Sequence, residues 1–281
     1  MSQDTHDTAP TRFVEAGGIR FAYRRFGLPD SSPSLLLNYF AANLDNWDPK
    51  VTNGLAADRD VILVDYPGIG GSSGGTPSTV AALTKHCIEF CRVLNLTRID
   101  VVGFSLGGMV AQQLAAEHPE MVRRILLLGT GPRGGEGLVF DDLSVDELDD
   151  EEGLLMKAFF TQSDVGKAAG RAYIERIRLR VADRDPPVPK QAAIAQLAAI
   201  REWGLIPQTS RFEMLGKIHH PTLIVHGSKD VVAMPGQRIP TRAAPSRCAA
   251  HHVPRCEPRR TIPACGGLPA TCEAVSRQLV V

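Results

Sequence analysis

VVGFSLGG, residues 101–108, is an apolar run that breaks into glycines around one serine, Ser105. An Ala, Gln and Leu-rich segment follows, which predicts a strand turning sharply into a helix with the serine at the corner. Side chains two positions before and two positions after such a corner would collide, and Gly103 and Gly107 remove them. A serine held in this way is a candidate nucleophile that needs a neighbouring base to take its proton. The alternative interpretation is a strand followed by a flexible glycine turn.

Short apolar runs elsewhere in the chain predict the rest of a sheet. Runs rich in Leu, Ile and Val suit strands buried on both faces of a parallel sheet, and helical patterns separate several of them. The alternation predicts an α/β fold, with a mostly parallel open sheet flanked by helices. The predicted strands are 34–40, 60–65, 99–104, 124–129 and 221–227, the helices are 79–94 and 107–118, and a hairpin covers 13–26.

The chain of 281 residues is long enough for one large domain. We predict a core of residues 13–132 and 207–239, and a helical cap of about 133–206, where helical periodicity continues without a convincing strand. The acidic stretch 141–152 in this cap lacks the glycine and the spacing of a calcium loop, so a solvated helix face is the better interpretation.

Composition favours a small-molecule partner. The 31 basic residues balance 31 acidic ones, so no net field favours nucleic acid or an anionic membrane. No signal pattern or membrane-spanning run is evident, which makes a cytoplasmic protein the expectation, with the oligomeric state left open. Cys87 and Cys91 lie four apart in a helical pattern, where a core face is favoured over a metal site. No metal and no cofactor is expected.

Several stretches resemble the α/β-hydrolase family in the family's order. GFSLGG (103–108) resembles the nucleophile elbow, DYPGIGGSS (65–73) the Asp-x-x-Gly-x-Gly-x-Ser loop, and HGSKDVVAMP (226–235) the acid loop. LNYFAANLDNWDP (37–49) resembles the oxyanion loop, although Asn38-Tyr39 or Tyr39-Phe40, depending on the alignment, replaces the usual His-Gly pair. The resemblance covers about residues 13–239.

The resemblance implies a role for each matching residue. Ser105 would attack the substrate, and the backbone amides of Leu106 and of Phe40 or Ala41 would hold the oxyanion. Asp230 would orient the base; its alternative role is to cap the next helix. The loop residues Asp65, Gly68 and Gly70 are interpreted as shaping their loop rather than as catalytic.

The base is the difficult part of this assignment. His252, with His251 as its alternative, follows Asp230 as the family order requires, but the surrounding SRCAAHHVPRCEPRR shows no strand-then-loop pattern. We therefore predict that the tail of about 240–281 is frame-shifted. A reading offset by one base permits Asp-Ala-Ser-His-Gly-Ala-Leu-Phe-Gln, with its histidine under Pro258, 28 residues after Asp230. A chain that lacks this histidine and the final strand and helix is expected to be poorly stable and nearly inactive.

The function that we predict is cofactor-independent serine hydrolysis of small carboxylic esters. Perhydrolase or non-haem haloperoxidase activity would use the same triad, and a catalytically impaired ligand-binding relative is the alternative of another class. GTGPRG (129–134) formally matches a dinucleotide fingerprint, but Pro132 and the glycines that follow do not begin a helix, so the match is interpreted as accidental. Apolar helix faces around Phe159 and Trp203 are expected to set the preferred acyl chain length.

Overall fold

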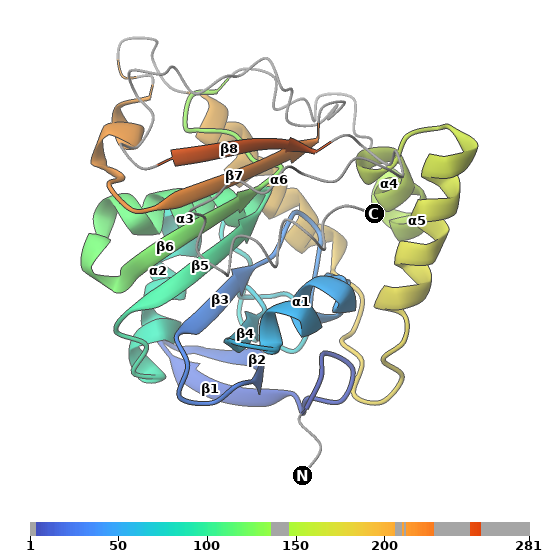
Figure 1. The fold of residues 1–281 in the computed structure, drawn as a ribbon, viewed down its shortest axis with the longest axis horizontal. Coiled ribbons are helices and arrows are strands. Elements are labelled where there is room, and N and C mark those ends of the chain that lie inside the picture. Colours follow the sequence, from blue (N-terminus) through green and yellow to red (C-terminus); the bar gives the residue numbers. More distant parts are fainter. Residues whose placement is uncertain (1–3, 136–145, 206–209, 211, 228–247, 254–281) are drawn as a thin grey trace.

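The computed structural model describes residues 4–135, 146–205, 210, 212–227 and 248–253. Its sheet has the strand order β1-β2-β4-β3-β5-β6-β7-β8 (Figure 1). β1 and β2 form an antiparallel hairpin, β2 pairs antiparallel with β4, and all other neighbours are parallel. This arrangement confirms the predicted fold class. The strands are β1 Arg12–Ala16, β2 Ile19–Gly27, β3 Pro33–Leu37, β4 Asp60–Val64, β5 Ile99–Phe104, β6 Val122–Leu128, β7 Thr222–Gly227 and β8 Cys248–Val253.

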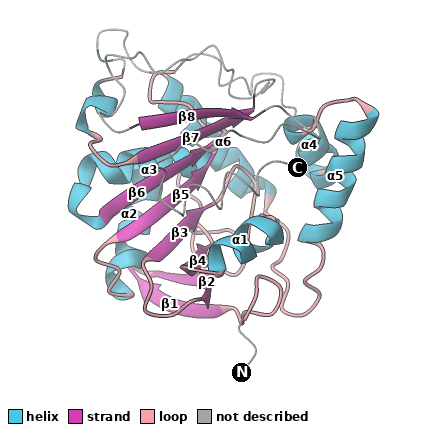
Figure 2. Ribbon diagram, viewed as in Figure 1, coloured by secondary structure: helices cyan, strands magenta, loops and turns pink. Residues whose placement is uncertain are grey.

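Helices cover both faces of the sheet, as the unbroken apolar strands require (Figure 2). Successive strand residues point to opposite faces, so Leu35 and Leu37 pack in one hydrophobic cluster while Leu36 packs in the other. The first cluster includes α2 (Val80–Val93), α3 (Leu106–Glu117) and α6 (Lys190–Gly204), and the second includes α1 (Pro49–Ala56). Short 3-10 turns lie at Leu44–Asn46, Pro119–Met121, Asp146–Asp149 and Glu213–Lys217.

Cys87 and Cys91 lie on the buried face of α2, in the first hydrophobic cluster. The hydrogen bond between the two thiols raises the pKa of Cys87 well above its usual range, and burial adds to the shift. Both cysteines are free. They are therefore part of the core, as the helical spacing predicted.

The segment predicted as a cap divides into two parts. α4 (Glu151–Phe159) and α5 (Asp164–Ile177) form a separate small cluster with Tyr39 and Ala42, and they stand beside the carboxyl ends of the strands (Figure 1). α6 instead packs in the main core through residues that include Trp203. The acidic stretch begins outside the described residues, and its described end forms a 3-10 turn and the start of α4, where Asp150 caps the helix by accepting a hydrogen bond from Gly153 N (2.9 Å).

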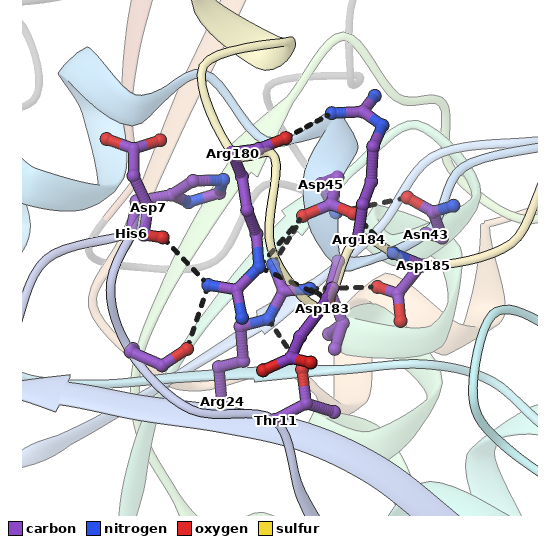
Figure 3. Close-up of polar contacts among 12 residues, drawn as sticks. His6, Asp7, Thr11, Arg24, Asn43, Asp45, Arg180, Asp183, Arg184 and Asp185 are labelled. Atoms are coloured by element: carbon purple, nitrogen blue, oxygen red, sulfur yellow. Dashed lines mark hydrogen bonds and ion pairs between the residues drawn. The ribbon is translucent and has the colours of Figure 1, made fainter.

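A buried polar cluster ties the chain after α5 to the core (Figure 3). The fully buried Arg24 donates to Asp45 (Nη1 to Oδ1, 2.5 Å) and forms an ion pair with Asp185 (Nη2 to Oδ2, 3.3 Å). Arg180 donates to the backbone carbonyls of Asp7 (3.0 Å) and Ala9 (2.9 Å), which draws the N-terminal segment into the same cluster. The cluster therefore anchors three distant parts of the chain to one another.

The charges of this cluster are strongly perturbed by burial. Burial raises the pKa of Asp185 to about 6, although the neighbouring Arg24 opposes the shift. Burial lowers the pKa of His6 to about 4, and the charge of Arg24 adds to that effect. The His6 ring lies 3.0 Å from the hydroxyl of Thr52 (Nδ1 to Oγ1). The histidine is thus neutral and hydrogen-bonded in the folded protein at neutral pH.

β8 corrects the expectation that the tail contains no strand. Residues Cys248–Val253 pair in parallel with β7 over its whole length. The edge of a sheet presents unpaired backbone N–H and C=O groups, and a neighbouring segment can satisfy them whatever its side chains are. The sequence pattern depends on side chains, so it does not show that the backbone groups at the edge of β7 need hydrogen-bond partners. Nowhere in the described parts of the chain is a helix both long and apolar enough to cross a membrane.

Candidate active site

Ser105 sits between β5 and α3 with a strained backbone. Its φ is 49° and its ψ is −112°, a conformation that costs a non-glycine residue about 1–3 kcal/mol. Four hydrogen bonds hold it there: its N–H donates to Leu128 O (2.9 Å), and its carbonyl accepts from Thr130 Oγ1 (2.7 Å), Gly108 N (2.8 Å) and Met109 N (3.2 Å). The surrounding structure therefore imposes the sharp corner that the sequence predicted.

The glycines around Ser105 permit close contacts between α3 and two strands. A β-carbon on Gly103 would lie 2.5 Å from Gly107 O and 2.6 Å from Gly108 Cα, so β5 and α3 approach backbone to backbone. A β-carbon on Gly107 would collide with the backbone of Leu37 at the end of β3. These contacts supply the steric reason for the spacing and bring the first turn of α3 against the loop that follows β3.

The loop after β3 carries the candidate oxyanion amides. Leu106 is the first residue of α3, where a backbone N–H has no partner within the helix. Of the two candidates across from it, Phe40 is buried, and Ala41 has a positive φ of 55°. The Ala41 N–H donates to Gln196 Oε1 on α6 at 2.8 Å. Ala41 could therefore bind an oxyanion only after releasing Gln196.

Asp65 organises the loops on either side of it. Its carboxylate accepts hydrogen bonds from the backbone N–H of Leu44 (3.0 Å) and of Gly71 (3.3 Å). Burial raises the pKa of this carboxyl well above its usual range, and the charge of Asp185 adds to the shift. Gly70 has a φ of 53°, and a side chain there would collide with the Asp65 carboxylate. These contacts are those of a residue that shapes its loop.

Aromatic rings join the cap to the residue before Ser105. Phe159 on α4 stacks on Phe104, with ring centroids 5.2 Å apart, and packs edge-on against Tyr39 at 5.0 Å. The hydroxyls of Tyr39 and Tyr173 lie 3.0 Å apart. Burial raises the pKa of Tyr39 well above its usual range, and the hydroxyl of Tyr173 adds to the shift. These rings form an apolar wall beside the elbow.

Trp203 lies apart from this wall. Its side chain is fully buried in the main core, and its indole N–H donates to Gly131 O at 3.2 Å. The structure therefore separates the two aromatic residues that were expected to line one pocket. Phe159 contacts the residue next to the nucleophile, whereas Trp203 supports the chain after β6 from inside the core.

The predicted acid and bases have different outcomes. Asp230 lies outside the described residues. His251 and His252 lie on β8, and the strand register aligns Phe104, Leu128, Val225 and His251 across the sheet. Adjacent strands are about 4.8 Å apart, so the backbone of His251 is about 14 Å from that of Phe104. This is a separation of backbones across three strand spacings, whereas a nucleophile and its base must bring side-chain atoms to within about 3 Å of each other.

The dinucleotide-like stretch 129–134 forms no helix start in the described residues. Gly134 has a φ of 73° and lies in a turn, in which the N–H of Gly135 donates to Pro132 O at 2.9 Å. A bound pyrophosphate needs a helix N-terminus at the last glycine. The stretch instead supports the elbow, because Thr130 Oγ1 donates a hydrogen bond to Ser105 O (2.7 Å) and Gly131 O accepts one from Gln112 Nε2 on α3 (3.1 Å).

A mostly parallel sheet flanked by helices, with a serine at a strained strand-to-helix corner, defines the class of α/β-hydrolase folds. The sequence profile of the alpha/beta hydrolase fold matches residues 35–172. An alpha/beta hydrolase fold protein from Chitinophaga pinensis has 36% sequence identity, a TM-score of 0.83, and coverage of 90% of this chain and 91% of that chain. This chain belongs to the α/β-hydrolase fold family, and by class it is a hydrolase.

Two of the curated relatives with named activities are a depolymerase and an esterase. A poly(3-hydroxyalkanoate) depolymerase of Ectopseudomonas oleovorans is 36% identical over 113 residues, which are 40% of this chain and 39% of the depolymerase. A pimeloyl-[acyl-carrier protein] methyl ester esterase of Edwardsiella ictaluri is 26% identical over 219 residues, or 75% of this chain and 78% of the esterase. The chain thus spans well under half of the first relative and about three quarters of the second.

Proposed function

We propose that this chain is a cofactor-independent serine hydrolase built to cleave small carboxylic esters. The observation that carries the proposal is the strained, braced conformation of Ser105 at the strand-to-helix corner. Strain of this kind persists only where the surroundings impose it, and it is concentrated at functional sites. The esterase named among the relatives supports an ester as the substrate.

The proposed chemistry begins with attack by Ser105 Oγ on the ester carbonyl while a histidine takes its proton. The negative charge that develops on the carbonyl oxygen is held by the amides of Leu106 and Phe40, and the histidine then protonates the leaving alcohol. Loss of the alcohol leaves an acyl group on Ser105 Oγ. A water molecule, deprotonated by the same histidine, then attacks this acyl group, which releases the acid and frees Ser105. Asp230 would orient the histidine and stabilise its charged form.

We propose that the histidine of this triad is the one encoded under Pro258 in the shifted frame. His251 and His252 lie within β8, paired with β7, and not in a loop after a strand, which supports a base that comes from a loop beyond the last strand. The nucleotide sequence near codon 240 tests this directly. An early stop codon in the shifted frame would refute it, and so would loss of an existing activity in His251→Ala or His252→Ala.

A p-nitrophenyl ester panel and a fluorophosphonate probe test the function. We expect probe labelling and ester turnover to be low in the present chain and to rise after a one-base restoration of the frame. Ser105→Ala should abolish both, whereas Ser78→Ala, at an exposed serine, should change neither. Turnover that survives Ser105→Ala would contradict the assignment. A restored chain that binds esters but never labels would indicate the ligand-binding alternative, and peroxide-dependent turnover above hydrolysis would indicate a perhydrolase.

A further inference from the structure

Gln196 is a buried polar residue on an otherwise apolar helix face. Its side chain is fully buried, and its α6 neighbours Ala193, Leu197 and Ile200 belong to the main hydrophobic core. Its Oε1 accepts the hydrogen bond from Ala41 N at 2.8 Å. Its Nε2 has no hydrogen-bond partner in the described part of the chain. Sequence pattern offered no signal for this contact, because it joins residues 155 positions apart.

Stability alone does not account for a glutamine at this position. One hydrogen bond contributes about 0.5–1.5 kcal/mol, whereas a buried donor without a partner costs about 1–3 kcal/mol. An apolar side chain of similar size would avoid that cost. What the contact does supply is a fixed geometry at Ala41.

Ala41 is the strained residue at the tip of the loop after β3. Its φ of 55° is a left-handed conformation that costs a residue with a β-carbon free energy, and it persists only if the surroundings hold it. The ends of this loop are fixed within the core: the Asn38 side-chain amide donates to Asn43 O, and Leu44 N donates to Asp65. Gln196 holds the tip from a different element.

We propose that Gln196 is a positioning residue for the oxyanion hole. Its Oε1 binds the Ala41 N–H and fixes the peptide plane between Phe40 and Ala41. This restrains the backbone of Phe40, whose own N–H, in the preceding peptide, is the proposed oxyanion donor. The proposal rests on the proposed function for its meaning in catalysis, but the Gln196–Ala41 contact itself is measurable without turnover. Because α6 packs in the core, it supplies a more rigid support for the loop than α4 and α5 would.

Amide hydrogen exchange of Ala41, measured by NMR on the full chain, tests the contact. Gln196→Met keeps the volume and removes the acceptor, so the Ala41 amide should exchange about tenfold faster relative to the amides of β5. Gln196→Glu keeps an acceptor oxygen and should retain the protection. Gln191→Met, at an exposed position on the same helix, is the matched control and should change nothing.

Unchanged Ala41 exchange in Gln196→Met, or equal loss of protection in Gln196→Met and Gln196→Glu, would overturn the proposal. Faster exchange of the β5 amides as well in Gln196→Met would mean that this variant is generally destabilised. In that case retained protection of the Ala41 amide in Gln196→Glu would support the proposal, and its loss would overturn it. In a chain with measurable esterase activity, Gln196→Met should lower kcat about tenfold or more with little change in KM, and Gln196→Glu should restore it. Failure of Ser105 to label would refute the proposed function but leave the exchange result valid.

Discussion

Gly103→Ala tests whether the close approach of β5 and α3 is what builds the corner at Ser105. The new methyl carbon would lie 2.5 Å from Gly107 O, 2.6 Å from Gly108 Cα and 2.7 Å from the carbonyl carbon of Gly107. Ordinary contacts between such atoms are roughly 3.5 Å, so the first turn of α3 must move away by about 1 Å. All three contacts are backbone atoms, and no side chain can turn aside to accommodate the methyl group.

The displacement has two consequences of different size. Overpacking of this kind costs about 1–3 kcal/mol, which should lower the denaturant midpoint in chemical unfolding. The same shift carries the Leu106 amide away from the loop after β3, and a misplacement of about 1 Å lowers turnover about 100-fold. The unfolding measurement does not require activity, so it can be made on the present chain.

Gly216→Ala is the matched control for this experiment. Gly216 has no neighbouring atom within 4 Å of an added β-carbon, and its backbone is not left-handed. The control should therefore be neutral, or stabilising by up to about 1 kcal/mol, because it restricts the unfolded chain. If Gly103→Ala and Gly216→Ala unfold at the same denaturant concentration, the steric argument for the corner is wrong.

Four further perturbations follow from the buried cluster, the aromatic wall and the main core. Asp45→Asn leaves the charge of Arg24 buried without its main partner and should cost about 3–5 kcal/mol in chemical unfolding. His6→Gln should remove an acid-dependent loss of stability. The folded pKa of His6, about 4, lies below the unfolded value of 6.5. The stability that the neutral histidine contributes is therefore complete above pH 6.5 and declines by roughly 3 kcal/mol as the pH falls through 4. Phe159→Ala should shift the preferred acyl chain length in an ester series, whereas Trp203→Ala should destabilise the fold by about 3–5 kcal/mol.

The first three of these have a clear contrary result. The pair formed by Arg178 and Glu152 is half-exposed, so Arg178→Met should cost under about 1 kcal/mol, and a similar cost for Asp45→Asn would refute the buried-charge argument. Burial raises the pKa of Asp185 to about 6, so its pH effect on stability has the opposite sign to that of His6. Its contribution to the free energy of unfolding falls as the pH rises from about 4 to 6. If the free energy of unfolding of His6→Gln depends on pH in the same way as that of the parent, His6 does not cause the acid-dependent loss of stability. Equal losses on all esters in Phe159→Ala would exclude a role in chain length.

The local sequence determined the elements and the corner. Strand and helix assignments depend on side chains within a few residues of one another, and VVGFSLGG carries its apolar run, its serine and its glycines in one such window. The same holds for the Gly17-Gly18 turn of the first hairpin, where both residues have a positive φ. The order of these elements predicted the α/β class, because alternating strands and helices leave few other arrangements.

Only the tertiary structure decided which distant groups meet. Gln196 and Ala41 lie 155 positions apart, and Asp185, in the segment after α5, lies 161 positions from Arg24, so neither pairing leaves a pattern in the sequence. The same limit applies to Phe159 and Trp203, which look alike as apolar aromatic residues of one segment but pack in different clusters. β8 shows the converse: backbone pairing at a sheet edge acts through N–H and C=O groups that every residue shares, so side-chain pattern could not predict it.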